Sequence, residues 1–160
     1  MGNIPAPVKI DSEILAEIYQ EARNAFPNEC CGWLCGDKSG DRVTVVRKCV
    51  NVQDSGTHQT VSDRTAEKAY VFSVEDVLEL SKSFDSDMPA LIIYHSHPNG
   101  HAYFSETDRQ VATWGDEPAF PVQQLVIGID YQQIVSSAQF AWSEDENGFI
   151  EIDQYTGAAI

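Results

Sequence analysis

The chain has 160 residues, is 42% hydrophobic and carries a formal net charge of −15 at pH 7. Its length and apolar content suit one folded domain with a sizeable core rather than a disordered chain. The excess of carboxylates disfavours nucleic acids and anionic membrane surfaces as partners, because binding to either depends on Lys and Arg. No stretch approaches the roughly 18 apolar residues of a membrane span, and the first residues lack the features of a secretory signal. We therefore expect a cytoplasmic protein.

The acidic residues gather in the segments 75–87, 106–117 and 144–153. A solvated surface accounts for them most simply. A basic protein partner and adaptation to a salty cytoplasm are alternatives that the sequence leaves open.

Hydrophobic periodicity and turn residues predict the elements of the first half of the chain. Apolar side chains recur at spacings of three, four and seven residues after Asp11 and Ser12, either of which is a candidate helix cap. Apolar runs bounded by Gly and Asp predict strands, and a polar stretch without periodicity predicts a long loop. In chain order the predicted elements are a helix over 14–26, strands over 30–35 and 42–52, a loop over 53–68 and a short strand over 69–72.

The second half alternates helices and strands. Ser73 and Ser105 are each followed three residues later by an acid, a pattern that caps the start of a helix. Gly115 and Pro118 are expected to end the second of these helices. The order of elements predicts an α/β protein with a mixed sheet flanked by helices. The predicted strands of this half lie over 90–97, 122–129, 134–142 and, as a last short one, 149–152.

Two histidines, His95 and His97, stand at the end of an apolar strand. Because strand side chains alternate between faces, both imidazoles point to the same side, about 6–7 Å apart along the chain. Asp108, in the first turn of the next helix, completes a two-His, one-carboxylate set, which leaves a fourth tetrahedral position for water, as in catalytic zinc sites. An acid outside this set would be needed to move the proton of that water, and Glu29 is a candidate. Ser105 could donate its hydroxyl to a developing oxyanion.

Each of these residues also has a plain structural explanation. Paired histidines at a strand end are often partly exposed polar side chains, Ser105-x-x-Asp108 is a helix-capping pattern, and Glu29 follows a proline that stops a helix. The combination of all five is far more specific than any one of them.

That combination resembles the motif of the JAB/MPN metalloprotease family, also called JAMM, whose zinc isopeptidases include deubiquitinases. The family motif is Glu, a long gap, His-Ser/Thr-His-Pro, six residues, Ser, two residues and Asp. Here it reads Glu29, then His95-Ser96-His97-Pro98, then Ser105 and Asp108. The flank over 27–36 also resembles the family's sequence around its catalytic acid.

The resemblance covers about residues 8–142 and implies a three-layer α/β/α fold with a central mixed sheet, similar to that of cytidine deaminases. It implies a single domain over 1–160, with a C-terminal strand or tail over 143–160. It also implies one catalytic Zn²⁺. The assigned roles are His95, His97 and Asp108 as zinc ligands, Glu29 as general acid/base, Ser105 as the hydroxyl that polarises the carbonyl, and Ser96 as support for the ligand loop.

The implied function is hydrolysis of a peptide or isopeptide bond after the C-terminal glycine of a ubiquitin-like or sulfur-carrier protein. The compact chain is similar to stand-alone prokaryotic or phage members of the family. A phage-tail or cell-wall peptide hydrolase is an alternative within enzymes, although such proteins usually carry a second hydrolase domain. A non-catalytic scaffold is the alternative from another class, and the intact motif argues against it.

The remaining reactive and aromatic residues lie outside the motif. We expect the cysteines to be buried, reduced thiols that pack as small hydrophobes, with a redox or zinc role as the alternative, because their spacing is not the paired C-x-x-C of a structural zinc site. His58 is expected to be solvated. His101 is expected to have a structural or solvent-facing role, with contact to substrate as the alternative. Tyr103-Phe104 could anchor its loop in the core or form a landing surface for a substrate tail. The cysteines are Cys30, Cys31, Cys35 and Cys49.

Overall fold

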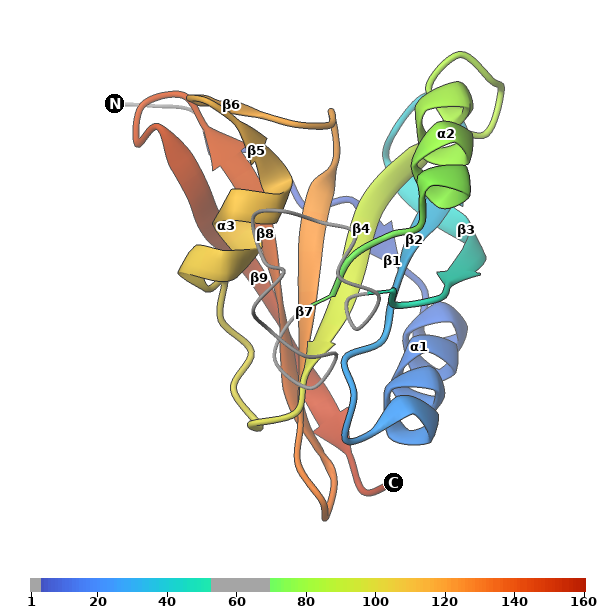
Figure 1. Ribbon diagram of the computed structural model, residues 1–160, viewed down its shortest axis with the longest axis vertical. Coiled ribbons are helices and arrows are strands. Elements are labelled where there is room, and N and C mark those ends of the chain that lie inside the picture. The colour runs from blue at the N-terminus through green and yellow to red at the C-terminus, as the bar shows by residue number, and fades with distance from the viewer. Residues whose placement is uncertain (1–3, 53–69) are drawn as a thin grey trace.

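The computed structural model describes residues 4–52 and 70–160 (Figure 1). The loop expected over 53–68, together with His58, lies outside the described residues. The helices are α1 (Ser12–Ala25), α2 (Val74–Ser83) and α3 (Glu106–Ala112). The strands are β1 (Lys9–Ile10), β2 (Cys31–Gly36), β3 (Arg42–Cys49), β4 (Ala90–His97), β5 (Thr113–Trp114), β6 (Glu117–Pro118), β7 (Gln123–Ile129), β8 (Ile134–Ser143) and β9 (Gly148–Ala158).

Seven of these strands form one mixed sheet in the order β1-β3-β2-β4-β7-β8-β9. β4 runs antiparallel to β2 and parallel to β7, so the strand that ends in the two histidines lies at the centre of the sheet. Figure 1 shows β4 and β7 between α1 and α2 on one side of the picture and α3 on the other. The short strands β5 and β6 form a separate hairpin.

Alternation of side chains along the central strands creates two cores. Leu34 and Tyr94 lie in a buried cluster with Ile18 of α1. Trp33 and Ile93, their neighbours in the chain, lie in a second buried cluster with Leu80 of α2 and others. Because successive strand residues point to opposite faces, α1 covers one face of the sheet and α2 the other. This is the α/β/α layering that the family resemblance implies, around the mixed sheet that the order of elements predicts.

The predicted elements are largely confirmed, with four corrections. β3 ends at Cys49 and not at residue 52, and residues 70–72 are not a strand. The side chain of Asn51 explains both of these differences. It donates to the Glu29 carbonyl and accepts from the Val71 N–H, in place of the regular backbone bonds of a strand. α3 ends at Ala112, since the following residues form the hairpin of β5 and β6. β9 is far longer than the strand expected over 149–152, because it pairs along the whole of β8.

Candidate metal centre

His95 and His97 are the last histidines of β4, and their rings meet at the end of the strand. Both are buried, with exposed fractions of 0% and 5%. They point to the same face, as the alternation along a strand requires, and their Nε2 atoms lie 3.2 Å apart. The predicted convergence of the two imidazoles is therefore present.

Asp108 brings a carboxylate to the same point from the first turn of α3. Its Oδ1 lies 2.9 Å from His95 Nε2, and its Oδ2 lies 3.0 Å from His97 Nε2. Asp108 is itself buried, with 4% exposed. One carboxylate thus faces two imidazole nitrogens in a closed, polar cluster.

The hydrogen-bond pattern of His97 decides what that cluster can bind. Its Nδ1 lies 3.0 Å from the backbone carbonyl oxygen of His101. A carbonyl only accepts, so Nδ1 carries a hydrogen, and Nε2 is the nitrogen that can offer a lone pair to a metal. That lone pair faces a carboxylate oxygen of Asp108 and the second imidazole, an arrangement that a shared cation stabilises. The donor set therefore fits one metal ion.

Burial and mutual contacts set the protonation of the cluster. Burial lowers the pKa of His95, although the carboxylate of Asp108 opposes this shift. Burial acts to raise the pKa of Asp108, but its interactions with His95 and His97 prevail and hold that pKa well below its usual range. A neutral imidazole and an ionised carboxylate are the forms that coordinate metals.

Ser105 is the N-cap of α3, and it forms a reciprocal pair with Asp108. The Asp108 backbone N–H donates to Ser105 Oγ at 3.0 Å, while the Ser105 backbone N–H donates to Asp108 Oδ2 at 2.9 Å. The capping explanation of this pattern is therefore correct for the local structure. It does not exclude the catalytic one, because a hydroxyl that accepts from the backbone keeps its own O–H to donate.

Glu29 lies two residues before β2, the strand beside β4, and it is buried, with 4% exposed. A carboxylate oxygen of Glu29 and ring nitrogens of His95 and His97 all lie within 4.8 Å of one another. These three residues could hold a metal by themselves. We favour Asp108 over Glu29 as the carboxylate ligand, because Asp108 lies 2.9 and 3.0 Å from the two imidazoles. Glu29 then remains as a second carboxylate within 4.8 Å of both imidazoles.

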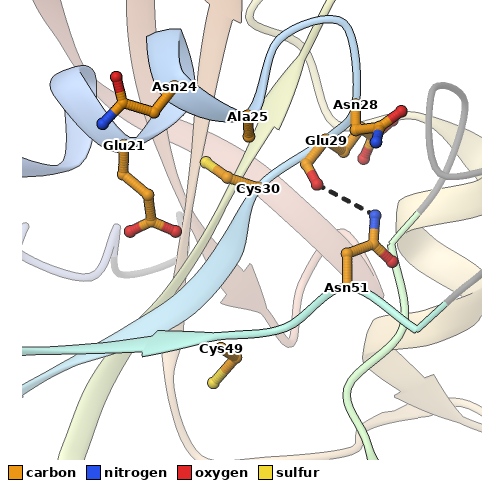
Figure 2. A pocket seen from close by; sticks show the side chains of 8 residues that line it. All are labelled: Glu21, Asn24, Ala25, Asn28, Glu29, Cys30, Cys49 and Asn51. Carbon is orange, nitrogen blue, oxygen red and sulfur yellow. Dashed lines mark hydrogen bonds between the residues drawn. The ribbon is translucent and has the colours of Figure 1, made fainter.

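A pocket of about 390 Å³ lies beside Glu29 (Figure 2). The amide of Asn51 points toward Glu29, and its Nδ2 donates to the Glu29 backbone carbonyl at 3.0 Å. Sequence reasoning missed Asn51, which it placed inside a strand, and a lone Asn in a run of valines carries no signal for such a contact. The pocket is lined by Glu21, Asn24, Ala25, Asn28, Glu29, Cys30, Cys49 and Asn51.

Ser96 joins the strand of the histidines to the strand that follows Glu29. Its buried Oγ accepts from the Cys30 backbone N–H at 2.8 Å, and its own N–H donates to the Cys30 carbonyl at 3.1 Å. This geometry is consistent with the support that the family resemblance implies for Ser96.

Tyr103 and Phe104, in the loop after Pro98, have different surroundings, although the sequence suggested one role for both. Phe104 packs against Phe140 and Phe149, with ring centroids 5.5 and 4.7 Å away, so it anchors the loop in a core cluster. Tyr103 remains 48% exposed, and its ring meets that of His97 edge-on at 5.0 Å. His101 is exposed and contributes its carbonyl rather than its side chain.

The four cysteines are free thiols and supply no atom to this cluster. Cys30 and Cys31 are buried, while Cys35 and Cys49 are half-buried. Burial raises the pKa of all four thiols. These features match small buried hydrophobes. In the part of the chain that the structure describes, no helix is both long and apolar enough to cross a membrane.

Comparison with known proteins places this arrangement in a family. Residues 11–138 match the family model described as prokaryotic homologs of the JAB domain. The CysO-cysteine peptidase of Mycobacterium tuberculosis is 29% identical over 107 residues, which cover 67% of this chain and 66% of that protein. The desampylase of Haloferax volcanii is 32% identical over 101 residues, which cover 63% of this chain and 66% of that protein. The matched region thus spans a little less than two thirds of either relative.

Two solved structures are similar over nearly the whole chain. A protein from Desulfitobacterium hafniense has a TM-score of 0.58 and 26% identity, and the match covers 89% of this chain and 87% of that one. A protein from Salinibacter ruber has a TM-score of 0.60 and 21% identity, with 92% and 90% covered, which supports the fold alone. Because the family match includes the strand of the histidines, Glu29 and α3, the chain belongs to the prokaryotic homologs of the JAB domain.

Proposed function

We propose that the chain is a zinc-dependent metallopeptidase or isopeptidase that cuts an amide bond after the C-terminal glycine of a ubiquitin-like or sulfur-carrier protein. The observation that carries this proposal is the convergence of His95, His97 and Asp108, whose facing atoms lie 2.9–3.2 Å apart. Tetrahedral zinc with bonds of about 2.0–2.1 Å separates its ligand atoms by about 3.3 Å, close to these values. The names of the two curated relatives, a CysO-cysteine peptidase and a desampylase, support this class of substrate.

In this proposal the three ligands would hold one Zn²⁺, which when bound would polarise a carbonyl and acidify a water molecule. His97 keeps its lone pair directed at the metal site because the His101 carbonyl holds the hydrogen on Nδ1. Burial of all three ligands excludes bulk solvent, which strengthens the electrostatic interactions inside the site.

Glu29 and Ser105 then move the proton and stabilise charge. The Glu29 carboxylate accepts a proton from the attacking water and donates it to the nitrogen of the leaving amine. The Ser105 hydroxyl donates to the oxygen that becomes negative when the carbonyl is attacked. The capping pair with Asp108 fixes the position of that hydroxyl relative to the ligand set.

The test uses the purified chain with fusions of ubiquitin-like and sulfur-carrier proteins, followed by intact mass of the products. We expect cleavage after the terminal glycine, its loss in Glu29→Gln, and zinc content retained in that variant. Glu146→Gln, at an exposed acid in the turn between β8 and β9, is the matched control and should cleave normally. Normal turnover by Glu29→Gln would overturn the role of Glu29.

Two alternatives are decided by the same preparation. A protein that lacks near-stoichiometric zinc and cleaves no fusion favours a non-catalytic scaffold. A protein that binds zinc but cleaves only peptidoglycan peptides favours a cell-wall or phage-tail hydrolase.

A further inference from the structure

The three proposed ligands differ in how the protein holds them. His97 has its Nδ1 against the His101 carbonyl, and Asp108 accepts from the Ser105 backbone N–H. The Nδ1 atom of His95, in contrast, is buried and has no hydrogen-bond partner among the described residues. Imidazoles that bind metals almost always donate from the second nitrogen, which fixes the orientation of the ring. Among the described residues, the orientation of the His95 ring therefore depends on a contact other than such a hydrogen bond.

The ring of Tyr70 could fix the orientation of the His95 ring. It lies over the ring of His95, with centroids 4.5 Å apart and an interplanar angle of 24°. Both side chains are buried, with exposed fractions of 3% for Tyr70 and 0% for His95. Burial raises the pKa of the Tyr70 phenol well above its ordinary value, so the ring is uncharged. Stacking of aromatic rings stabilises a pair beyond the area that it buries.

The protein fixes Tyr70 independently of the metal site. The next residue, Val71, donates its N–H to Asn51 Oδ1 at 3.0 Å and accepts at its carbonyl from Val52 N–H at 2.9 Å. The ring of Tyr70 also meets Phe72 edge-on at 5.6 Å. Phe72 in turn meets Trp33 in the α2 core, with ring centroids 5.7 Å apart.

The contact with Asn51 links this segment to the proposed general acid. The same Asn51 side chain accepts from Val71 and donates to the Glu29 carbonyl, as Figure 2 shows for the second bond. The backbone next to Tyr70 and the backbone of Glu29 are thereby tied to one side chain.

We infer that Tyr70 is a positioning residue for His95. The stacked ring of Tyr70 holds the His95 imidazole in the plane that directs its Nε2 toward the metal site. This role rests on the proposed metal site. For His95, the stacking would do what the hydrogen bond to the His101 carbonyl does for His97. Because loss of an outer-shell partner typically costs 10–100-fold in metal affinity, removal of the ring should weaken metal binding by about tenfold or more.

The experiment measures Zn²⁺ affinity of the metal-free chain by competition with a chromophoric chelator, with Co²⁺ absorption as a spectroscopic readout of ligand geometry. Tyr70→Leu should lose about tenfold or more in affinity and alter the Co²⁺ spectrum. Tyr70→Phe keeps the ring and should bind as the wild type does. Tyr19→Leu removes a buried tyrosine, 4% exposed, from the α1 face, and should lower the melting temperature without changing affinity.

The outcomes separate the proposals. Wild-type Zn²⁺ affinity in Tyr70→Leu would overturn the positioning role. So would a loss of affinity in Tyr70→Phe, or in Tyr19→Leu, as large as the loss in Tyr70→Leu. A wild-type chain that takes up no zinc would instead overturn the metal site, before any substitution is examined. Should Tyr70→Leu not fold, Tyr70→Met fills a similar space with a flexible chain and carries the same expectation.

Discussion

Ser96 and Cys30 exchange two hydrogen bonds across the end of the sheet. The Cys30 N–H donates to Ser96 Oγ at 2.8 Å, and the Ser96 N–H donates to the Cys30 carbonyl at 3.1 Å. Both residues are buried. One neighbour of Cys30 is Glu29, and the neighbours of Ser96 are the two histidines, so this exchange sets the distance between the proposed acid and the proposed ligands.

We therefore predict that Ser96→Ala lowers cleavage more than it lowers zinc content. The change leaves the Cys30 N–H buried without its acceptor, which costs about 1–3 kcal/mol of folding free energy. It also removes a bond that holds the backbone next to Glu29 in place. We therefore expect kcat to fall, while His95, His97 and Asp108 still bind zinc. Steady-state kinetics, metal analysis and denaturant unfolding measure the three effects.

Ser137→Ala is the matched control for that substitution. Ser137 is also buried, and its hydroxyl lies 2.7 Å from the Tyr19 hydroxyl on the opposite face from the histidines. It should lose comparable stability with kcat unchanged. Equal loss of kcat in both variants would show that Ser96 acts through general stability alone.

Removal of a proposed ligand should remove the metal, and the histidine and aspartate variants should differ in the stability of the metal-free protein. His97→Ala and Asp108→Ala should each lose zinc and activity. Asp108→Ala also leaves the Ser105 backbone N–H without its acceptor in the capping box of α3, which costs about 1–3 kcal/mol more. Metal analysis and melting of the metal-free proteins test this. Full zinc content in Asp108→Ala would favour Glu29 as the carboxylate ligand.

Glu21 should make the stability of the chain depend on pH. Burial raises the pKa of Glu21 above its ordinary value of 4.5, although the hydrogen bond from the Tyr94 hydroxyl opposes the shift. A raised carboxyl pKa means that the contribution of the group is fully present below pH 4.5 and is lost as pH rises through the folded-state pKa.

Glu21→Gln, which keeps an acceptor for Tyr94, should therefore raise the melting temperature at pH 8 relative to the wild type. The gain should shrink as the pH falls toward the ordinary pKa of a glutamate, because both proteins are then neutral at this position. Melting curves across this range provide the measurement. A gain that is independent of pH would contradict burial of the charge as its cause.

Gly128 allows the loop after Pro98 to lie against β7. A Cβ at Gly128 would meet the Gly100 carbonyl oxygen at 2.8 Å and the Ala102 nitrogen at 3.0 Å. Gly128→Ala should push this loop away, and with it the His101 carbonyl that orients His97. We expect weaker zinc binding and a lower melting temperature.

Gly148→Ala provides the comparison for that prediction. The nearest atom to a Cβ there is the Glu146 carbonyl oxygen at 3.8 Å, an ordinary contact. Chelator competition and melting should give wild-type values. Unchanged zinc affinity in Gly128→Ala would mean that the loop position does not affect the ligands.

Sequence alone determined the local parts of the candidate site. The spacing of His95 and His97 follows from alternation along one strand, and the Ser105–Asp108 pair follows from the geometry of one helix start. The main strands and helices were predictable for the same reason, because their apolar periodicity is a local property of the chain.

Tertiary structure alone decided how distant segments meet. Glu29 reaches the histidines through the register of β2 against β4, in which Cys31 pairs with His95, and that register depends on contacts 64 positions apart. Asn51 and Tyr70 gained their contacts because two chain segments without regular secondary structure lie side by side. No periodic pattern marks such residues, since a side chain that bonds or stacks across the fold leaves no repeat in its own neighbourhood.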